Sequence, residues 1–186
     1  MKSKDKFFEI YFSSIERDGR DDLYDWLTKT DFFDAPASTR YHADYEGGLC
    51  EHSIHVWEEL VRLIEVYPQI HPDPETVAIV SLLHDLCKIG CYKTELRNKK
   101  ENGVWHTVPV YTYQEDFCFG GHGSKSVYLV QKFMPLRDEE AVAINCHMGF
   151  ADQSPNDFSR GNAFGQFPLA WLLHVADESA TYLRET

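Results

Sequence analysis

Hydrophobic residues recur along most of the chain at the three- and four-residue spacing that is typical of amphipathic helices. Pro68, Gly90 and Pro135 mark the ends of three such segments, because proline and glycine seldom continue a helix. The pattern predicts an all-α protein, a helical bundle with helices over residues 5–16, 21–29, 49–67, 75–89, 124–133, 139–148 and 167–183.

Residues 91–123 do not follow the helical pattern. Val104 to Tyr113 is rich in β-branched and aromatic residues and follows Gly103, which predicts a small β-hairpin around residues 103–113. We expect the surrounding segment, residues 91–118, to form one wall of a pocket. Residues 149–165, rich in Gly, Asn, Ser and Pro, are expected to form a loop.

Nothing in the pattern indicates a second domain. The chain has 186 residues, of which 43% are hydrophobic and 14% aromatic, so it contains enough apolar material for a sizeable core. We therefore expect residues 1–186 to form a single domain, with an N-terminal helical extension over 1–40 and the functional core over 41–186.

The charge balance narrows the range of partners. Thirty acidic and 18 basic residues give a net charge of −12, and such a chain repels long polyanions. The densest basic cluster, Arg97, Lys99 and Lys100, is expected to be a solvated loop. These features disfavour long DNA or RNA as the substrate.

The cysteines indicate the compartment. No CxxC motif is present among Cys50, Cys87, Cys91, Cys118 and Cys146, which lie mostly in apolar runs, where thiols behave as small hydrophobic groups. We see no secretory signal peptide and no apolar run long enough to cross a membrane, so we expect a reducing, cytoplasmic setting. The sequence gives no indication of the oligomeric state.

The pair His84-Asp85 is the strongest chemical signal, because it interrupts an apolar run from Val77 to Cys87. Burying a carboxylate beside an imidazole is costly unless something compensates it, and a divalent transition metal binds both ligand types. An ion pair with Lys88 is the alternative explanation for Asp85, but it leaves His84 unexplained. The side chains of adjacent helical residues point about 100° apart. His84 and Asp85 could therefore bind the same ion only if it lay at the boundary between their two helix faces.

Two further candidates lie on apolar helix faces. His52 shares a stripe with Val56 and Leu60, and Asp177 follows a run that is apolar nearly all round. A core histidine bonded to backbone is the alternative for His52, and a hydrogen bond from His174 is the alternative for Asp177.

Three more histidines have different surroundings. His122 lies between glycines where a helix begins, and His147 lies near a helix end, where the helix dipole alone favours histidine. Each is a candidate ligand, although a surface position explains either one alone. His55 shares its face with Glu58, Glu59 and Arg62, so it is expected to be solvated and its replacement by alanine to be silent.

Together these residues resemble the HD-domain metal-dependent phosphohydrolase superfamily over roughly residues 41–185. The matching segments are Gly48-Leu-Cys-Glu-His52, Leu82-Leu-His-Asp-Leu-Cys-Lys88 and Leu172-Leu-His-Val-Ala-Asp177. The order H…HD…H…H…D is similar to that of the members that bind two metals. The GYP motif of the cyclic-dinucleotide phosphodiesterases in this superfamily is not evident, which argues against an enzyme of that type. A single histidine, His147, followed by Met148, stands where many of the members that bind two metals have a pair of histidines.

The resemblance implies an HD-type, phosphodiesterase-like fold and a ligand set. His52, His84, Asp85 and Asp177 would hold one cation, and Asp85, His122 and His147 a second. Asp85 would be catalytic as the bridging ligand. Lys88 would contact a phosphate oxygen, with the ion pair to Asp85 as the alternative.

The donor set suits one or two divalent transition ions among Mn, Fe, Co, Ni and Zn. The activity implied is hydrolysis of a small phosphomonoester or phosphodiester, with a nucleotide favoured, because paired cations activate water and stabilise a phosphoryl oxygen. The competing interpretations are a diiron oxygenase of the same fold and a non-catalytic domain that senses a metal or nucleotide.

Overall fold

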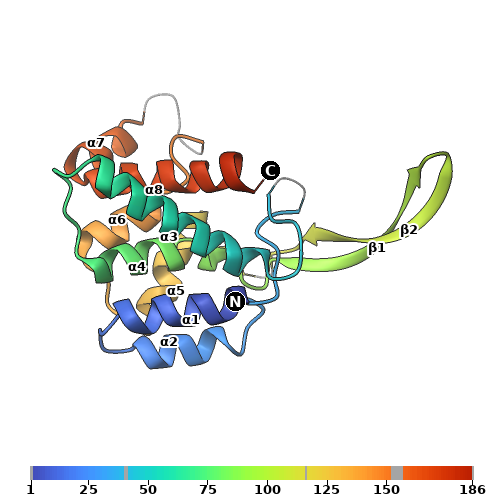
Figure 1. Ribbon diagram of the computed structural model, residues 1–186, viewed down its shortest axis with the longest axis horizontal. Coiled ribbons are helices and arrows are strands. Elements are labelled where there is room, and N and C mark those ends of the chain that lie inside the picture. Colours follow the sequence, from blue (N-terminus) through green and yellow to red (C-terminus); the bar gives the residue numbers. More distant parts are fainter. Residues whose placement is uncertain (1, 40–41, 116, 152–156, 186) are drawn as a thin grey trace.

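The computed structural model describes residues 2–39, 42–115, 117–151 and 157–185, and within these ranges the chain forms eight α-helices and a β-hairpin (Figure 1). A 3₁₀ turn (Leu86–Lys88) follows α4, and a π-helical turn (Ala180–Arg184) follows α8. The prediction of a mainly helical protein is confirmed. The end residues of the expected N-terminal extension (1–40) and functional core (41–186), namely residues 1, 40–41 and 186, lie outside the described residues. The helices are α1 (Ser3–Ser14), α2 (Arg20–Leu27), α3 (Gly48–Val66), α4 (Pro74–Leu83), α5 (His122–Gln131), α6 (Asp138–Cys146), α7 (Ser159–Gln166) and α8 (Pro168–Ser179), and the strands are β1 (Tyr92–Glu101) and β2 (Val104–Tyr113).

The centre of the molecule is enclosed by α3, α4, α6 and α8. α3 packs against both α4 and α8, and α6 packs against α8. Leu60, Ile79, Ile144 and Leu173, one from each helix, are fully buried in this core. Burial of a side chain of this size contributes about 1.5–3 kcal/mol, so the four helices are held in fixed positions relative to one another.

α4 is the most deeply buried helix, since every side chain from Thr76 to Leu83 is shielded from solvent. Its first turn is fixed by the Asp73 carboxylate, which accepts a hydrogen bond of 3.0 Å from the Glu75 amide. The prediction that this helix continues to residue 89 is wrong, because Asp85 leaves the helical conformation with φ −107° and ψ 19°.

The hairpin is longer than predicted. Its second strand, Val104–Tyr113, lies where the composition indicated, but a first strand, Tyr92–Glu101, pairs with it antiparallel over its full length. Asn102 and Gly103 form the turn with φ of +50° and +86°, as in the tight hairpin turns that an Asn-Gly pair favours. Arg97, Lys99 and Lys100 therefore lie in a strand and not in a loop, although they are exposed as expected.

The predicted loop over residues 149–165 is partly helical. Residues 152–156 lie outside the described residues, but α7 begins at Ser159 despite its glycines. Tertiary contacts compensate for the weak helix propensity, because the Phe164 ring packs on Trp171, with 5.3 Å between ring centroids, and on Phe150 at 5.5 Å.

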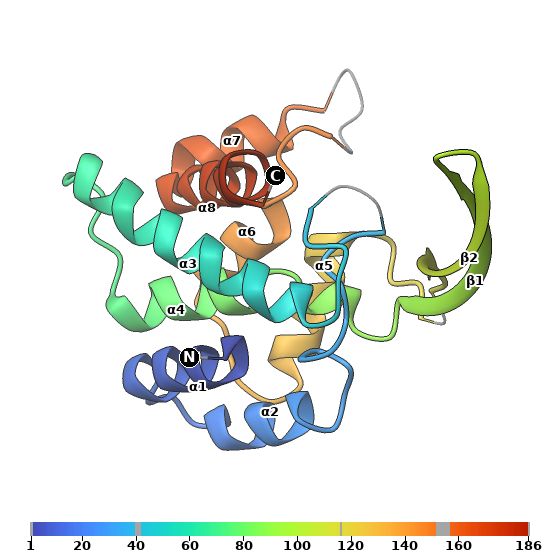
Figure 2. The ribbon, with the colours of Figure 1, turned by 45° about the vertical axis from the view of Figure 1, so that its right-hand side comes forward.

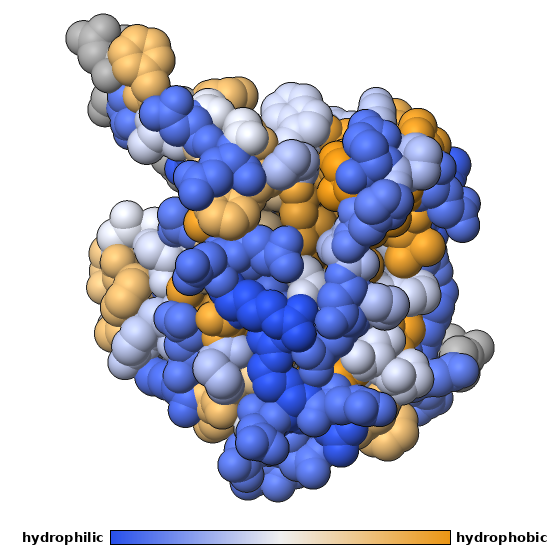
Figure 3. Space-filling model, turned by 90° about the vertical axis from the view of Figure 1, so that its left-hand side faces the viewer, coloured by the Kyte–Doolittle hydropathy of each residue, from blue (hydrophilic) through white to orange (hydrophobic). Residues whose placement is uncertain are grey.

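The outer surface is largely hydrophilic on the side away from the hairpin, with small apolar patches between polar residues (Figure 3). None of the helices in the described ranges is both long enough and apolar enough to span a bilayer.

Candidate metal centre

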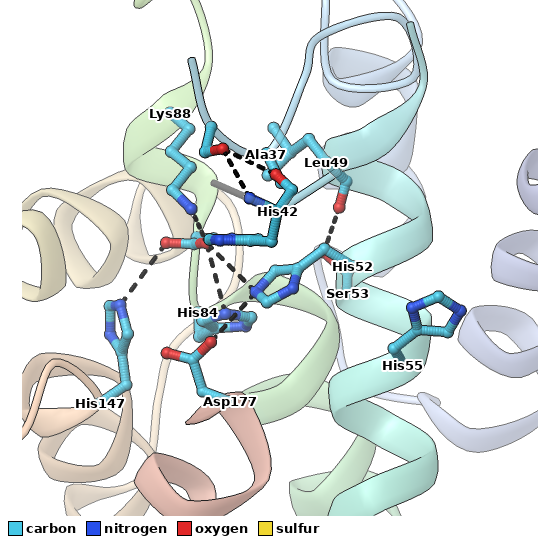
Figure 4. A network of polar contacts seen from close by, with 12 residues as sticks. Ala37, His42, Leu49, His52, Ser53, His55, His84, Lys88, His147 and Asp177 are labelled. Atoms are coloured by element: carbon cyan, nitrogen blue, oxygen red, sulfur yellow. Dashed lines mark hydrogen bonds and ion pairs between the residues drawn. The ribbon is translucent and has the colours of Figure 1, made fainter. Parts of the chain in front are cut away.

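Five of the six predicted ligands meet at the centre of the helical body (Figure 4). His52 Nε2 lies 3.1 Å from Asp177 Oδ1 and 3.7 Å from Asp85 Oδ2. His147 Nε2 lies 3.5 Å from the other Asp85 oxygen. α3 supplies His52, the end of α4 supplies His84 and Asp85, the end of α6 supplies His147, and α8 supplies Asp177.

The three buried imidazoles are oriented in the same way. His84 Nδ1 lies 2.8 Å from the Ser81 carbonyl oxygen, and His147 Nδ1 lies 2.7 Å from the Ile144 carbonyl oxygen. A carbonyl only accepts, so Nδ1 carries a proton in each of these rings, which leaves Nε2 as the atom available to a metal ion. The carboxylate of Glu185, 3.1 Å from His52 Nδ1, orients His52 likewise.

The Nε2 atoms of all three imidazoles are buried and have no hydrogen-bond partner. His52 Nε2 makes an ion-pair contact of 3.1 Å with Asp177 Oδ1. Three imidazole nitrogens and two carboxylates converge without hydrogen bonds between them, an arrangement that a bound cation would stabilise. The donor set therefore fits a divalent transition ion, and two overlapping triads, His52-His84-Asp85 and His84-His147-Asp177, have ligand atoms within 4.8 Å of one another.

The electrostatics of the cluster keep its carboxylates ionised, as metal ligation requires. Burial alone would raise the pKa of Asp85, but the charges of Lys88 and His84 hold it well below its usual range. Burial acts on Asp177 in the same sense, and its contact with His52 again lowers the pKa. Burial lowers the pKa of His84 to about 4, so this imidazole is neutral at pH 7. Burial would also lower the pKa of His52 and His147, but Asp177 and Glu185 raise the pKa of His52 to about 9, and Asp85 raises that of His147. A metal ion would therefore displace a proton from each of these two rings.

The backbone break at Asp85 lets two adjacent residues reach one centre. In a continuous helix their side chains would diverge by about 100°. Because Asp85 has left the helical conformation, its Oδ2 lies 3.5 Å from His84 Nε2. The sequence-based restriction to a shared helix edge therefore does not apply.

A cavity of about 210 Å³ adjoins the ligands and is lined by Asp85, Lys88, His122 and Asp177, among others. Lys88 Nζ lies 2.6 Å from Asp85 Oδ2, so the ion pair considered as an alternative is present. His122 lies on the cavity wall, with Nδ1 3.5 Å from Cys87 Sγ, and belongs to none of the ligand triads formed by the described residues.

The hairpin does not form a wall of this cavity, contrary to expectation. The other lining residues are His42, Met148 and three residues at the end of α8 and in its π-helical turn: Glu178, Thr181 and Tyr182. None of the described residues of the 91–118 segment lines the cavity, because the strands extend away from the helical body (Figures 1 and 2).

Two residues of the site were missed by the sequence analysis. His42 lines the cavity, and both its ring nitrogens are buried without a partner. Glu185 forms a third triad of potential ligands with His42 and His52. Neither residue lies in a segment with helical periodicity, so no pattern indicated that it is shielded from solvent.

The prediction that His55 is solvated is wrong. His55 is half-buried, and its Nδ1 lies 2.7 Å from Glu185 Oε1, although its ring points away from the ligand centre (Figure 4). Burial would raise the pKa of Glu185, but the two histidines lower it to about 2. Glu185 is therefore an anion held between His52 and His55.

Replacing Glu185 with glutamine is expected to weaken divalent-metal binding by about 10- to 100-fold, because the anion that orients His52 is lost. His55→Ala should act in the same direction but less strongly. Competition between the protein and a chelator of known affinity measures the change. Glu65→Gln, an exposed change on the helix that carries His52, is the control. An equal loss in both glutamine variants would contradict this role for Glu185.

Comparison with known proteins identifies the family of this chain. The family model of the HD domain matches residues 49–181, and the chain belongs to this family. Over 156 residues the chain is 27% identical to the dihydroneopterin 2',3'-cyclic phosphate phosphodiesterase of Methanocaldococcus jannaschii, an alignment that covers 82% of this chain and 53% of that relative. The chain thus spans about half the length of the relative. No solved structure matches.

Proposed function

We propose that this chain is a metal-dependent phosphohydrolase that cleaves a small phosphomonoester or phosphodiester, with a nucleotide as the favoured class. The observation that carries the proposal is the set of three buried Nε2 atoms that face Asp85 and Asp177 beside a cavity and have no hydrogen-bond partner. The name of the archaeal relative supports the reaction class, because that protein is a phosphodiesterase.

His52, His84, Asp85 and Asp177 are assigned to a first divalent ion, and Asp85, His122 and His147 to a second. A bound divalent transition ion supplies Lewis acidity and lowers the pKa of a bound water molecule. Asp85 is suited to a position between the two sites, because its oxygens face different histidines: Oδ2 faces His52 and Oδ1 faces His147.

Lys88 is assigned to the substrate. Its ammonium group lies on the cavity wall, and Asp85 raises its pKa against the lowering effect of burial, so it stays charged at neutral pH. A phosphate oxygen in the cavity would meet this charge directly. The size of the cavity, about 210 Å³, and the net charge of −12 both favour a small substrate over a polymer.

The test is elemental analysis of the purified protein together with a panel of nucleoside monophosphates, 2',3'- and 3',5'-cyclic nucleotides and a chromogenic phosphodiester, each with added Mn, Co, Ni or Fe. We expect bound transition metal, and metal-dependent release of phosphate or opening of the cyclic ester. Lys88→Met should raise KM about 10-fold or more and leave the metal content unchanged. Lys93→Met, on the exposed hairpin, is the control and should change neither KM nor the metal content.

Two results would overturn the proposal. Absence of hydrolysis with every metal would favour the non-catalytic sensor. Oxygen consumption by the iron-loaded protein without phosphoester cleavage would favour the oxygenase.

A further inference from the structure

The hairpin, residues 92–113, forms an arm that extends away from the helices (Figures 1 and 2). Each strand has 10 residues, which corresponds to about 33 Å at roughly 3.3 Å per residue. The arm is fixed at its base, where the Tyr92 hydroxyl donates a hydrogen bond of 3.1 Å to the Ala37 carbonyl. A two-stranded hairpin is at best marginally stable alone in water, so an arm of this length needs a covering surface.

The register gives the arm two unlike faces. Directly paired residues share a face, and one face carries the pairs Tyr92–Tyr113, Thr94–Tyr111, Leu96–Pro109, Asn98–Thr107 and Lys100–Trp105. We call this the aromatic face. The opposite face alternates charged residues of β1 with β-branched residues such as Val104 and Val108.

The aromatic face is open to solvent along the outer part of the arm. Leu96 is 73% exposed and Trp105 is 67% exposed. Large apolar side chains grouped on one face at this exposure are typical of an interaction surface. Pro109 within β2 and the lysines of β1 disfavour pairing of a further strand at the edges, so contact through the face is favoured.

The charge of the arm is opposite to that of the body. Four basic and two acidic residues give the arm a charge of +2, so the remainder of the chain carries −14. Among the basic residues in the outer half of β1, Lys100 lies on the aromatic face and Arg97 and Lys99 lie on the opposite face, whereas Asp44 and Glu46 are exposed on the segment beside the base. Burial together with the Glu46 carboxylate raises the pKa of Tyr111, which agrees with that placement.

We propose that two copies of this chain associate through their arms. The aromatic faces pack on each other in antiparallel orientation, so Lys100, at the outer end of the aromatic face of each arm, lies against the acidic 44–46 segment of the other copy. A two-fold arrangement of this kind uses the same surface twice, and this surface is apolar along its length and has opposite charges at its two ends.

Sedimentation equilibrium of the full chain at increasing concentration tests this proposal. The wild type should be a dimer, and Leu96→Ser with Trp105→Ser should raise the dimer dissociation constant at least about 10-fold, since buried aromatic anchors dominate such interfaces. Val104→Ser, which removes an apolar side chain from the opposite face, should leave the constant unchanged. A matched helical circular-dichroism spectrum confirms that each variant is folded.

A charge reversal makes the test specific to the antiparallel arrangement. Lys100→Glu should weaken the dimer, and adding Glu46→Lys to the same chain should restore it, whereas Lys99→Glu on the opposite face should leave the dimer unchanged. A wild-type monomer at all concentrations, an equal effect of Val104→Ser, or failure of the restoring substitution would overturn the proposal. So would a monomer that binds single-stranded RNA through Trp105.

Discussion

Replacing Asp85 with alanine is expected to remove most of the bound divalent metal and to lower phosphoester hydrolysis by at least about 100-fold. Substitution of a residue that hydrogen-bonds a metal ligand already lowers metal affinity or activity about 10- to 100-fold. Asp85 lies in the ligand cluster itself, so a larger loss is expected. Its carboxylate is the anion that both His52 and His147 approach, so its loss leaves the second proposed site without an acidic ligand.

The helical body should survive this change, because the core helices are held by apolar packing that does not involve Asp85. Metal content, the absorption spectrum of the cobalt-loaded protein and circular dichroism separate loss of the site from loss of the fold. Asp85→Asn keeps the side-chain volume and should also bind metal poorly. Glu65→Gln, an exposed change on α3, is the control. Unchanged metal content in the alanine variant would reject Asp85 as a ligand.

Replacing Arg17 with alanine should lower the free energy of unfolding by about 3–5 kcal/mol, the usual cost of leaving a buried charge without its partner. Glu140 is 0% exposed, and Arg17 reaches its two oxygens at 2.6 and 2.9 Å. The Thr76 hydroxyl, at 2.7 Å, and the Arg137 amide, at 2.8 Å, complete its hydrogen bonds. Urea unfolding at pH 7 measures the change, and Arg62→Ala, whose side chain is 73% exposed, should cost at most about 1 kcal/mol.

The same ion pair gives the Arg17 prediction a pH dependence. Burial would raise the pKa of Glu140, but the hydrogen bonds from Arg17, Arg137 and Thr76 lower it. A carboxyl group whose pKa is lowered by folding stabilises the protein fully above its unfolded pKa, about 4.3. This stabilisation is lost as the pH falls through the lower native pKa. The difference between wild type and Arg17→Ala should therefore shrink in acid, and a difference that is constant down to pH 3 would contradict the assignment.

The candidate metal ligands with the clearest signal in the sequence share one property. Each is a polar residue within a segment that is otherwise clearly apolar. His52 and Asp177 lie on apolar helix faces, and His84-Asp85 interrupts a continuous apolar run. A polar residue is informative in such a setting because its burial needs a reason. The structure places these side chains within a few ångströms of one another, and metal loading remains the test of their role.

The residues that were missed depend on contacts distant along the chain. His55 has polar neighbours on its helix, and only the return of the C-terminal segment brings Glu185 against it. His42 lies in an irregular segment, where periodicity gives no information about burial. The first strand of the arm is mostly charged, so strand propensity did not predict it. The Asn102-Gly103 turn was the available signal.

The ligands have one further consequence for how the molecule is held together. The side chains that converge on the centre come from α3, α4, α6 and α8, which are separated by long stretches of chain, while all five cysteines are free thiols. A metal ion bound by residues from all four helices would act as a cross-link in a chain that has no disulfide. It would close several long loops at one point and so stabilise the folded state. The free energy of unfolding would then increase with the fraction of the protein that has metal bound.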